Sequence, residues 1–178
     1  PLLVSFWGSQ GPRDMNLMTE DFVQRWVEEG RPFHYIHSGG RDYETMAQHL
    51  KERGVSVTDQ EVRPYIDNMP TVMAAADLVI CRAGASTLGE LTAMGKPAVL
   101  VPSPYVAANH QFKNAKVLAD RGAAELLEEK NCSGQSLYDT AVSLLANADK
   151  RREMSRAMKE LATPRAAEDI YKALMELL

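Results

Sequence analysis

The residues with the clearest chemical potential lie in the stretch Asp77–Glu90, which reads Asp-Leu-Val-Ile-Cys-Arg-Ala-Gly-Ala-Ser-Thr-Leu-Gly-Glu. Its apolar run, Leu78–Cys81, is typical of a buried strand. Small residues around Gly84 break that run, and an apolar-periodic helix follows. A strand, a short turn and a helix start together place unpaired backbone N–H groups and the positive end of a helix dipole where an anion can bind. We therefore predict a diphosphate site here.

The same residues allow a second interpretation. Thr87-Leu88-Gly89-Glu90 fits a capping box, in which Thr87 caps the helix and Glu90 reaches back to the Thr87 N–H. In the functional interpretation, Ser86, Thr87 and backbone N–H groups meet phosphate oxygens, and Glu90 accepts hydrogen bonds from a ribose. A carboxylate suits that role because it is acceptor-only and can bind both hydroxyls of a vicinal diol. The two interpretations can coexist if Glu90 changes partner when a ligand binds.

Two further loops follow predicted strands, and doubly wound sheets bind ligands at the carboxyl ends of their strands. In the loop 7–12, glycines on both sides of Ser9 let the backbone approach a phosphate or sugar closely, although an ordinary strand-to-helix turn looks the same. The loop 102–110 leads to Gln111 and Asn114, whose amides could bind sugar hydroxyls. The alternative for these residues is a solvated first helical turn capped by Asn109.

The elements that must position these loops alternate along the chain. We predict strands at residues 2–6, 33–37, 78–81, 97–101 and 123–127, with short extended pieces at 55–58 and 62–66. We predict helices at 14–29, 42–53 and 68–76, through Leu88 and Leu91, at 109–121, 133–146 and 149–161, and from Pro164 onward. This alternation predicts an α/β fold, a Rossmann-like parallel sheet with helices on both faces.

Composition narrows the class of protein. The 178 residues carry a formal net charge of −4, which argues against a nucleic-acid partner. Cys81 and Cys132 are far apart in the sequence and form no CxxC pair, so we expect no disulfide and a reducing compartment. The four histidines show no metal-binding spacing, so we expect no metal site. No apolar run approaches the roughly 18 residues of a membrane span. Because the chain begins at Pro1 directly in a strand, we expect a single domain, residues 1–178, cut from a longer protein.

Four motifs in a fixed order carry a family resemblance: Gly8-Ser9-Gln10-Gly11 with Asn16, then Tyr65–Met69, Ala76–Glu90 and Val101–Ala115. Together they resemble the C-terminal half of the bacterial UDP-N-acetylglucosamine transferases of peptidoglycan synthesis, the MurG family of glycosyltransferase family 28. Those enzymes convert lipid I to lipid II. The resemblance runs over nearly the whole chain but covers only about half of such an enzyme.

The resemblance implies substrate-binding roles for nine residues, to which the amide of Asn114 adds a tenth candidate. Ser9 would lie near the diphosphate and sugar, Ile66 and Met69 at the uracil, Ala85, Ser86 and Thr87 at the phosphates, Glu90 at the ribose, and His110 and Gln111 at the N-acetylglucosamine. His110 departs from the amide that the family commonly has. Trp7 and Pro12 depart from the Gly and Ala that are commoner in the first loop.

The resemblance also implies a division of labour. Such enzymes have the two-domain GT-B fold, and UDP-GlcNAc binds mainly to the C-terminal domain, without cofactor or metal. Lipid I, the contact with the inner face of the bacterial cell membrane, and the catalytic base would belong to an N-terminal domain absent from this chain. We therefore expect no catalytic residue here, a cytoplasmic and peripheral location for the full-length enzyme, and a reaction that inverts the anomeric carbon.

Three alternatives stay open. The catalytic subunit of a dolichol-linked UDP-GlcNAc transferase resembles the same half, although the segment Ala108-Asn109-His110-Gln111 favours the bacterial enzyme. A nucleotide-sugar epimerase domain would need its own acid–base carboxylates. A non-enzymatic, flavodoxin-like signalling module would need an acidic cluster after its first strand, and that strand ends here in Phe6-Trp7-Gly8.

Overall fold

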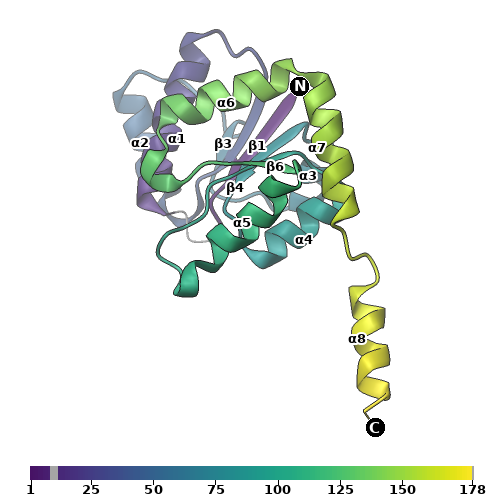
Figure 1. Ribbon diagram of the computed structural model, residues 1–178. Coiled ribbons are helices and arrows are strands. Elements are labelled where there is room, and N and C mark those ends of the chain that lie inside the picture. Colours follow the sequence, from purple (N-terminus) through teal and green to yellow (C-terminus); the bar gives the residue numbers. More distant parts are fainter. Residues whose placement is uncertain (9–11, 178) are drawn as a thin grey trace.

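The short apolar runs of the sequence form one parallel sheet in the computed structural model, which describes residues 1–8 and 12–177 (Figure 1). Within these residues the sheet has six strands in the order β3-β2-β1-β4-β5-β6. Their bounds are β1 Leu2–Phe6, β2 His34–Ser38, β3 Val62–Arg63, β4 Leu78–Cys81, β5 Ala98–Leu100 and β6 Ala124–Leu126. This is the Rossmann strand order, whereas a flavodoxin-like sheet has the order 2-1-3-4-5.

Helices connect the strands as the alternation predicts. The α-helices are α1 Arg13–Glu28, α2 Tyr43–Glu52, α3 Met69–Ala75, α4 Ala85–Met94, α5 His110–Asp120, α6 Gly134–Ala146, α7 Ala148–Glu160 and α8 Ala166–Met175. Short 3-10 turns at Gly40–Asp42, Ala107–Asn109 and Glu129–Asn131 precede α2, α5 and α6.

The helices cover the sheet in two layers with separate cores. Alternate side chains of the strands point to opposite faces, so Leu3, Leu78 and Ile80 belong to one cluster, and Val4 and Val79 belong to the other. The first cluster packs against α1, α2 and α6, and the second against α3, α4 and α5. Helix α7 reaches both clusters, because one of its buried methionines lies in each. The two-sided burial explains why the strands read as continuous apolar runs.

The direction in which strands are added reverses between β1 and β4. These neighbours are parallel, with Leu3 opposite Leu78 and Phe6 opposite Cys81. From β1 the chain adds β2 and β3 on one side, and from β4 it adds β5 and β6 on the other. In open α/β sheets ligands bind at the carboxyl ends of the strands at such a switch point. The carboxyl ends of β1 and β4 lie side by side there.

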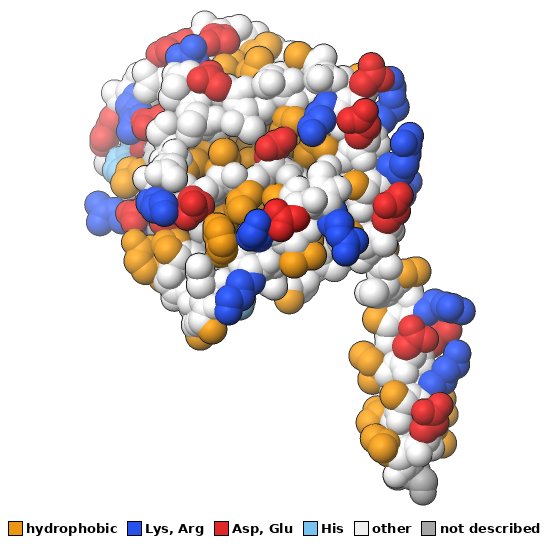
Figure 2. All heavy atoms as spheres, viewed as in Figure 1, with side chains coloured by type: hydrophobic (Ala, Val, Ile, Leu, Met, Phe, Trp, Pro, Cys, Tyr) orange, Lys and Arg blue, Asp and Glu red, His pale blue; other side chains and the backbone are white. Residues whose placement is uncertain are grey.

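Most predicted elements are confirmed, with differences at the sheet edge and at the end of the chain. Residues 55–58 form no strand, and only Val62–Arg63 of the 62–66 piece pairs with β2. Helix α8 forms as predicted but projects from the body of the protein (Figure 1) and has no buried residue among those described. One side of it is hydrophobic and the other charged (Figure 2), with Ile170, Tyr171, Leu174 and Met175 exposed.

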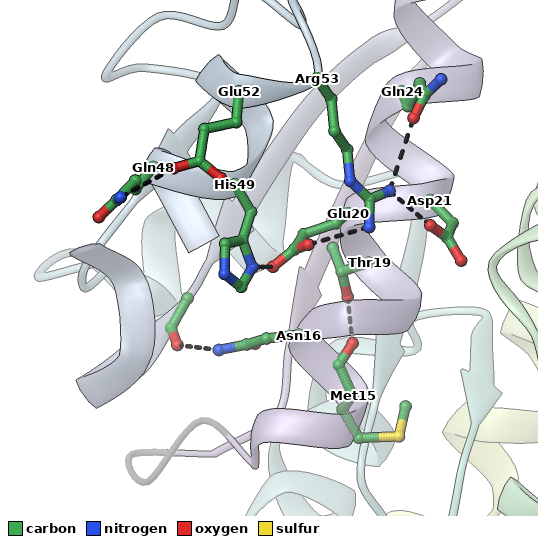
Figure 3. A network of polar contacts seen from close by, with 11 residues as sticks. Met15, Asn16, Thr19, Glu20, Asp21, Gln24, Gln48, His49, Glu52 and Arg53 are labelled. Carbon is green, nitrogen blue, oxygen red and sulfur yellow. Dashed lines mark hydrogen bonds and ion pairs between the residues drawn. The ribbon is translucent and has the colours of Figure 1, made fainter. Parts of the chain in front are cut away.

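A buried carboxylate joins α1 to α2 (Figure 3). Glu20 is 1% exposed; His49 Nδ1 donates to its Oε1 at 3.0 Å, and Arg53 Nη2 lies 3.3 Å from its Oε2. Arg53 also pairs with Asp21 at 2.6 Å. A carboxylate is buried only where cations and hydrogen bonds replace its water, so this network fixes the two helices against each other.

A second set of buried polar side chains lies on strands β1 and β2. The Ser5 hydroxyl lies 2.7 Å from both Tyr35 Oη and His37 Nδ1, and all three residues are buried. Burial disfavours charge and lowers the pKa of His37 from 6.5 to about 3, while the hydrogen bond with Ser5 opposes that change. Burial likewise raises the pKa of Tyr35. The imidazole of His37 is therefore neutral in the folded protein at neutral pH.

This neutral histidine predicts a loss of stability in mild acid. The unfolded chain takes up a proton near pH 6.5, and the folded protein does so only near pH 3. Between these values the unfolded state binds more protons, so the free energy of unfolding falls as pH falls, by up to about 1.4 kcal/mol per pH unit. Urea unfolding at several pH values should give a shallower pH slope for His37→Gln than for the wild type. His34→Gln, which changes an exposed histidine, should keep the wild-type slope, and equal slopes for all three proteins would contradict the assignment.

Candidate functional site

Helix α4 begins at the switch point without a side-chain cap. Its N-cap is Gly84, in an extended conformation, and no side chain accepts a hydrogen bond from the first turn. The first N–H of the helix with a backbone acceptor is that of Leu88, which donates to Gly84 O at 3.0 Å. The preceding N–H groups, from Ala85 to Thr87, point out of the helix end, as at any helix start. Outward-pointing N–H groups of this kind can bind an anion, so the geometry is compatible with the predicted diphosphate site.

The capping-box interpretation of this stretch is wrong. Because the helix begins at Ala85, Thr87 is its third residue and cannot be the N-cap. Ala85 and Ser86 are compatible with a first helical turn, and the extended Gly84 lets the helix start three residues earlier than the pattern implies, with the N-cap at Gly84 in place of Thr87. Glu90 is therefore free of a capping role.

The side chains of α4 that were predicted to bind ligand face outward. Ala85, Ser86 and Glu90 are exposed, and Thr87 is half-buried. Ser86 and Glu90 are four residues apart, so they lie on the same side of the helix. Burial, and then the charge of Glu90, raise the pKa of the Cys81 thiol at the end of β4. The carboxylate of Glu90 thus lies close enough to the end of β4 to influence it electrostatically.

The loop after β5 and the first turns of α5 are joined by hydrogen bonds to each other and to the loop after β4. Gln111 Oε1 accepts a hydrogen bond from the Ser103 N–H at 2.9 Å, which closes the proline-rich segment. His110 Nδ1 donates to Ala107 O at 3.0 Å, so in the neutral ring Nε2 is left as an acceptor. Asn114 Nδ2 lies 3.4 Å from Ala83 O. The structure therefore brings Gln111 and Asn114 to the same edge as α4.

The turn before α5 has a strained backbone. Ala108 and Asn109 have φ values of 51° and 52°, in the left-handed region that non-glycine residues rarely adopt. Asn109 does occupy the N-cap position of α5, as predicted, but its side chain makes no capping hydrogen bond. The helix start is set by the loop, and the strain lies beside His110. Such conformations are often found at functional sites.

A buried ion pair that the sequence analysis missed holds these loops together. Arg82 Nη1 donates to Val101 O at 3.0 Å and to Glu129 Oε2 at 2.5 Å, and both charged side chains are 9% exposed. Arg82 follows β4, Val101 follows β5, and Glu129 follows β6. One guanidinium therefore joins three consecutive strand ends. A signal was present in the sequence, because an arginine directly after a buried strand needs a partner.

The first loop is described only at its two ends. Ser9, Gln10 and Gly11 lie outside the described residues, so the predicted role of Ser9 is untested. Trp7 is buried, and its Nε1 donates to Thr19 Oγ1 at 2.8 Å, so this indole belongs to the core. Asn16 Nδ2 donates to Gly39 O at 2.9 Å and joins α1 to the loop after β2.

The predicted uracil residues lie between β3 and α3. The Ile66 side chain is buried in the second cluster, and Met69, the first residue of α3, is half-buried against that cluster. Among the described residues nothing hydrogen-bonds to the Ile66 backbone. Its N–H and C=O can thus hydrogen-bond to a planar base while the side chain stays in the core.

The described residues contain neither a cluster of potential metal ligands nor a helix of membrane-spanning length and hydrophobicity. Within residues 1–8 and 12–177 no three His, Cys, Asp or Glu side chains are grouped so that they could hold a metal ion. In the same part of the chain, no helix combines the length and the apolar character needed to cross a bilayer.

Comparison with known proteins identifies the family. The profile described as "Glycosyltransferase family 28 C-terminal domain" matches residues 2–170. The chain belongs to this family. Its Rossmann-like sheet is the C-terminal domain of the GT-B fold, and membership sets aside the alternative of a non-enzymatic module.

Two curated relatives of this family 28 domain carry the same name. The chain is 39% identical, over its whole length, to the UDP-N-acetylglucosamine–N-acetylmuramyl-(pentapeptide) pyrophosphoryl-undecaprenol N-acetylglucosamine transferase of Oenococcus oeni, and covers 48% of it. It is 38% identical to the enzyme of the same name from Bacillus cytotoxicus, with 97% of the chain and 47% of the relative covered. The chain thus spans about half the length of the curated relatives it matches.

A solved structure gives the same result for the fold. The crystal structure of Acinetobacter baumannii MurG matches 99% of this family 28 domain at a TM-score of 0.80 and 28% identity, and the match covers 52% of that chain. The sequence analysis therefore identified the family and the fold correctly.

The ion pair of Arg82 predicts a large stability effect. Arg82→Leu leaves the buried Glu129 carboxylate without its cation, and breaking such a pair costs about 3–5 kcal/mol. Lys130→Leu is the matched control, because it breaks the exposed pair of Lys130 with Glu128, at 3.1 Å, which contributes about 1 kcal/mol or less. Chemical denaturation measures both, and equal losses would show that the Arg82 pair is no more than a surface contact.

Proposed function

We propose that residues 1–178 are the donor-binding domain of a transferase that moves N-acetylglucosamine from UDP-GlcNAc to lipid I and so forms lipid II. The observation that carries this proposal is the uncapped start of α4 with Glu90 one turn further on. The family 28 profile and the name shared by the relatives support the choice of donor and acceptor.

In this proposal the donor lies across the carboxyl edge of the sheet. The N–H groups of Ala85, Ser86 and Thr87 and the helix dipole bind the diphosphate, and Glu90 accepts hydrogen bonds from the ribose hydroxyls. Backbone groups at Ile66 bind the uracil, with Met69 beside it. No metal is required, because the helix end itself supplies donors and partial positive charge.

The sugar would lie against the loop after β5. Gln111 Oε1 already accepts a hydrogen bond from the Ser103 N–H, so its Nε2 is the group left to donate to a sugar oxygen. His110 Nε2 is an acceptor in the neutral ring and can take a hydrogen bond from a sugar hydroxyl. Asn114 bonds to Ala83 O and would act mainly by keeping this helix against the phosphate loop. Ser9 would complete the site from the first loop.

The reaction divides between this domain and the half of the enzyme outside the chain. The hydroxyl of the lipid I sugar attacks the anomeric carbon from the face opposite the diphosphate, the bond from that carbon to the phosphate oxygen breaks, and UDP leaves with inversion. The hydroxyl proton passes to a base in the other half, which also holds lipid I at the membrane surface. This domain stabilises the charge that develops on the departing UDP.

The role of Glu90 can be tested by calorimetry. Glu90→Ala should weaken UDP-GlcNAc binding by about 1.5–3 kcal/mol, because it removes a charged acceptor from the ribose. Glu153→Ala, which changes an exposed carboxylate on α7, should bind like the wild type. Affinity should not change when a chelator is added. Unchanged binding by Glu90→Ala would leave that residue without a function in the site.

The division of labour predicts that the chain alone has no transferase activity. Residues 1–178 should bind UDP-GlcNAc yet form no lipid II from lipid I, because the base and the acceptor site are absent. A radiolabelled transfer assay, run beside a full-length relative as positive control, measures this. Turnover by the isolated chain would place the base within these residues.

A further inference from the structure

A basic hollow lies at the opposite edge of the sheet from the donor site. It has a volume of about 650 Å³ and is bounded by the residues before β4 and β5 and by one side of α7. Ligand pockets typically have volumes of about 300–1,000 Å³. Five lysines and arginines but only one carboxylate, that of Asp77, line it. The chain as a whole has a formal net charge of −4, so positive charge is concentrated here.

The lining residues of α7 lie at helical spacing. Arg152, Ser155, Arg156 and Lys159 are at positions i, i+3, i+4 and i+7, so they form one stripe along the helix. The other side of the hollow is the turn Met94–Pro97, where α4 ends and β5 begins. The hollow therefore has three cations and a hydroxyl along one wall.

Three of the five cations already have partners. Lys96 Nζ donates to Ala74 O and Ala76 O at the end of α3, and Arg151 donates to Leu144 O and Leu145 O at the end of α6. Arg152 pairs with Asp149. The contacts of Lys96 and Arg151 satisfy carbonyls that helix ends leave unpaired, and the contact of Arg152 is an ion pair. Together they account for the presence of three basic residues without any ligand.

Arg156 and Lys159 are the two cations that these contacts do not explain. Within residues 1–8 and 12–177 neither makes an ion pair, and Asp77, the carboxylate of the hollow, accepts a hydrogen bond from the Leu2 N–H at 2.7 Å. Lys96 uses two of its three N–H donors on carbonyls, which leaves one for a ligand. The hollow thus has an excess of donors and of positive charge.

Lys159 is held in place by close packing. A Cβ added to Gly95 would lie 2.4 Å from Lys159 Cε and 2.5 Å from Lys159 Cγ, so the stem of the lysine runs directly over this glycine. Gly95 also has a φ of 65°, which favours glycine. The turn thereby restricts Lys159 before any ligand arrives, and a restricted side chain loses less entropy on binding.

We propose that this hollow binds a soluble phosphate-bearing small molecule, with Arg156, Lys159, the Ser155 hydroxyl and the free donor of Lys96 as its contacts. Guanidinium groups match phosphate oxygens in pairs, and ammonium groups add point charges. The site is independent of the proposed donor site, because it lies where the strands begin.

The concave shape favours a small ligand over a membrane surface. Helix α7 also carries Asp149, Glu153 and Glu160, so its outer surface is mixed in sign and does not form a broad basic face. Figure 2 shows red and blue side chains interspersed along this side of the molecule. Anionic lipids attract clusters of basic residues on a flat or helical face. Here the excess of positive charge lies inside the hollow.

Inorganic pyrophosphate is a suitable probe, and its binding can be measured by ¹H–¹⁵N NMR of the isotope-labelled chain. The chain is first saturated with UDP, which keeps pyrophosphate out of the donor site. Amide signals of Gly95 and of Ser155–Lys159 should shift with a saturable curve. Arg156→Gln and Lys159→Gln, both exposed positions, should each raise the dissociation constant about two- to fivefold. Lys150→Gln removes the same charge from the same helix outside the hollow and should have no such effect.

Three results would overturn the proposal. Equal weakening by Lys150→Gln would mean that only general electrostatic attraction is measured. Shifts limited to Ala85–Thr87 would place all phosphate binding at the donor site. Sedimentation of the chain with phosphatidylglycerol vesicles, without any pyrophosphate-dependent shift, would identify a membrane contact in place of a small-molecule site. The folding of each variant is checked by its thermal unfolding midpoint.

Discussion

The parallel pairing of β1 with β4 is the constraint on which the site depends. In that pairing Phe6 lies opposite Cys81, so the two strands end level with each other. The strand order then continues outward in both directions, and α1 and α4 pack against different cores. The helices must diverge to reach opposite faces, and the start of α4 is left uncovered between them. An uncapped helix end at that point is a direct consequence of the topology.

Side-chain contacts then hold the loops that surround this helix end. Arg82 bonds to Val101 O and to Glu129, and Asn114 bonds to Ala83 O. Each contact joins segments that are distant in the sequence, and none of them uses the outward-pointing N–H groups of α4. The loops are therefore set before a ligand binds, and less ordering entropy is lost in the complex. The strained pair Ala108 and Asn109 lies within the segment that the hydrogen bond between Ser103 and Gln111 closes.

The sequence predicts those parts of the protein that depend on local pattern. The run Leu78–Cys81 is apolar because both of its faces are buried, and its predicted bounds match those of β4. The capping-box prediction was wrong because the pattern Thr-x-x-Glu does not by itself determine where a helix begins. The extended conformation of Gly84 allows an earlier start. Residues 55–58 have strand-like composition but no neighbour to pair with. The bond from Arg82 to Glu129 spans 47 residues, and no local signal gives the partner.

The two edges of the sheet present different chemistry to an anion. At the carboxyl edge helices begin, so backbone N–H groups and dipoles attract negative charge without any basic side chain. At the amino edge helices end, and their carbonyls repel it. Cations there must first satisfy those carbonyls, as Lys96 and Arg151 do at the ends of α3 and α6.

Only basic residues in excess of that requirement can attract a ligand. Arg156 and Lys159 are such an excess, and the packing of Lys159 over Gly95 shows that the turn of α4 accommodates it. Phosphate recognition at this edge must therefore rest on side chains, whereas at the other edge it rests on the backbone.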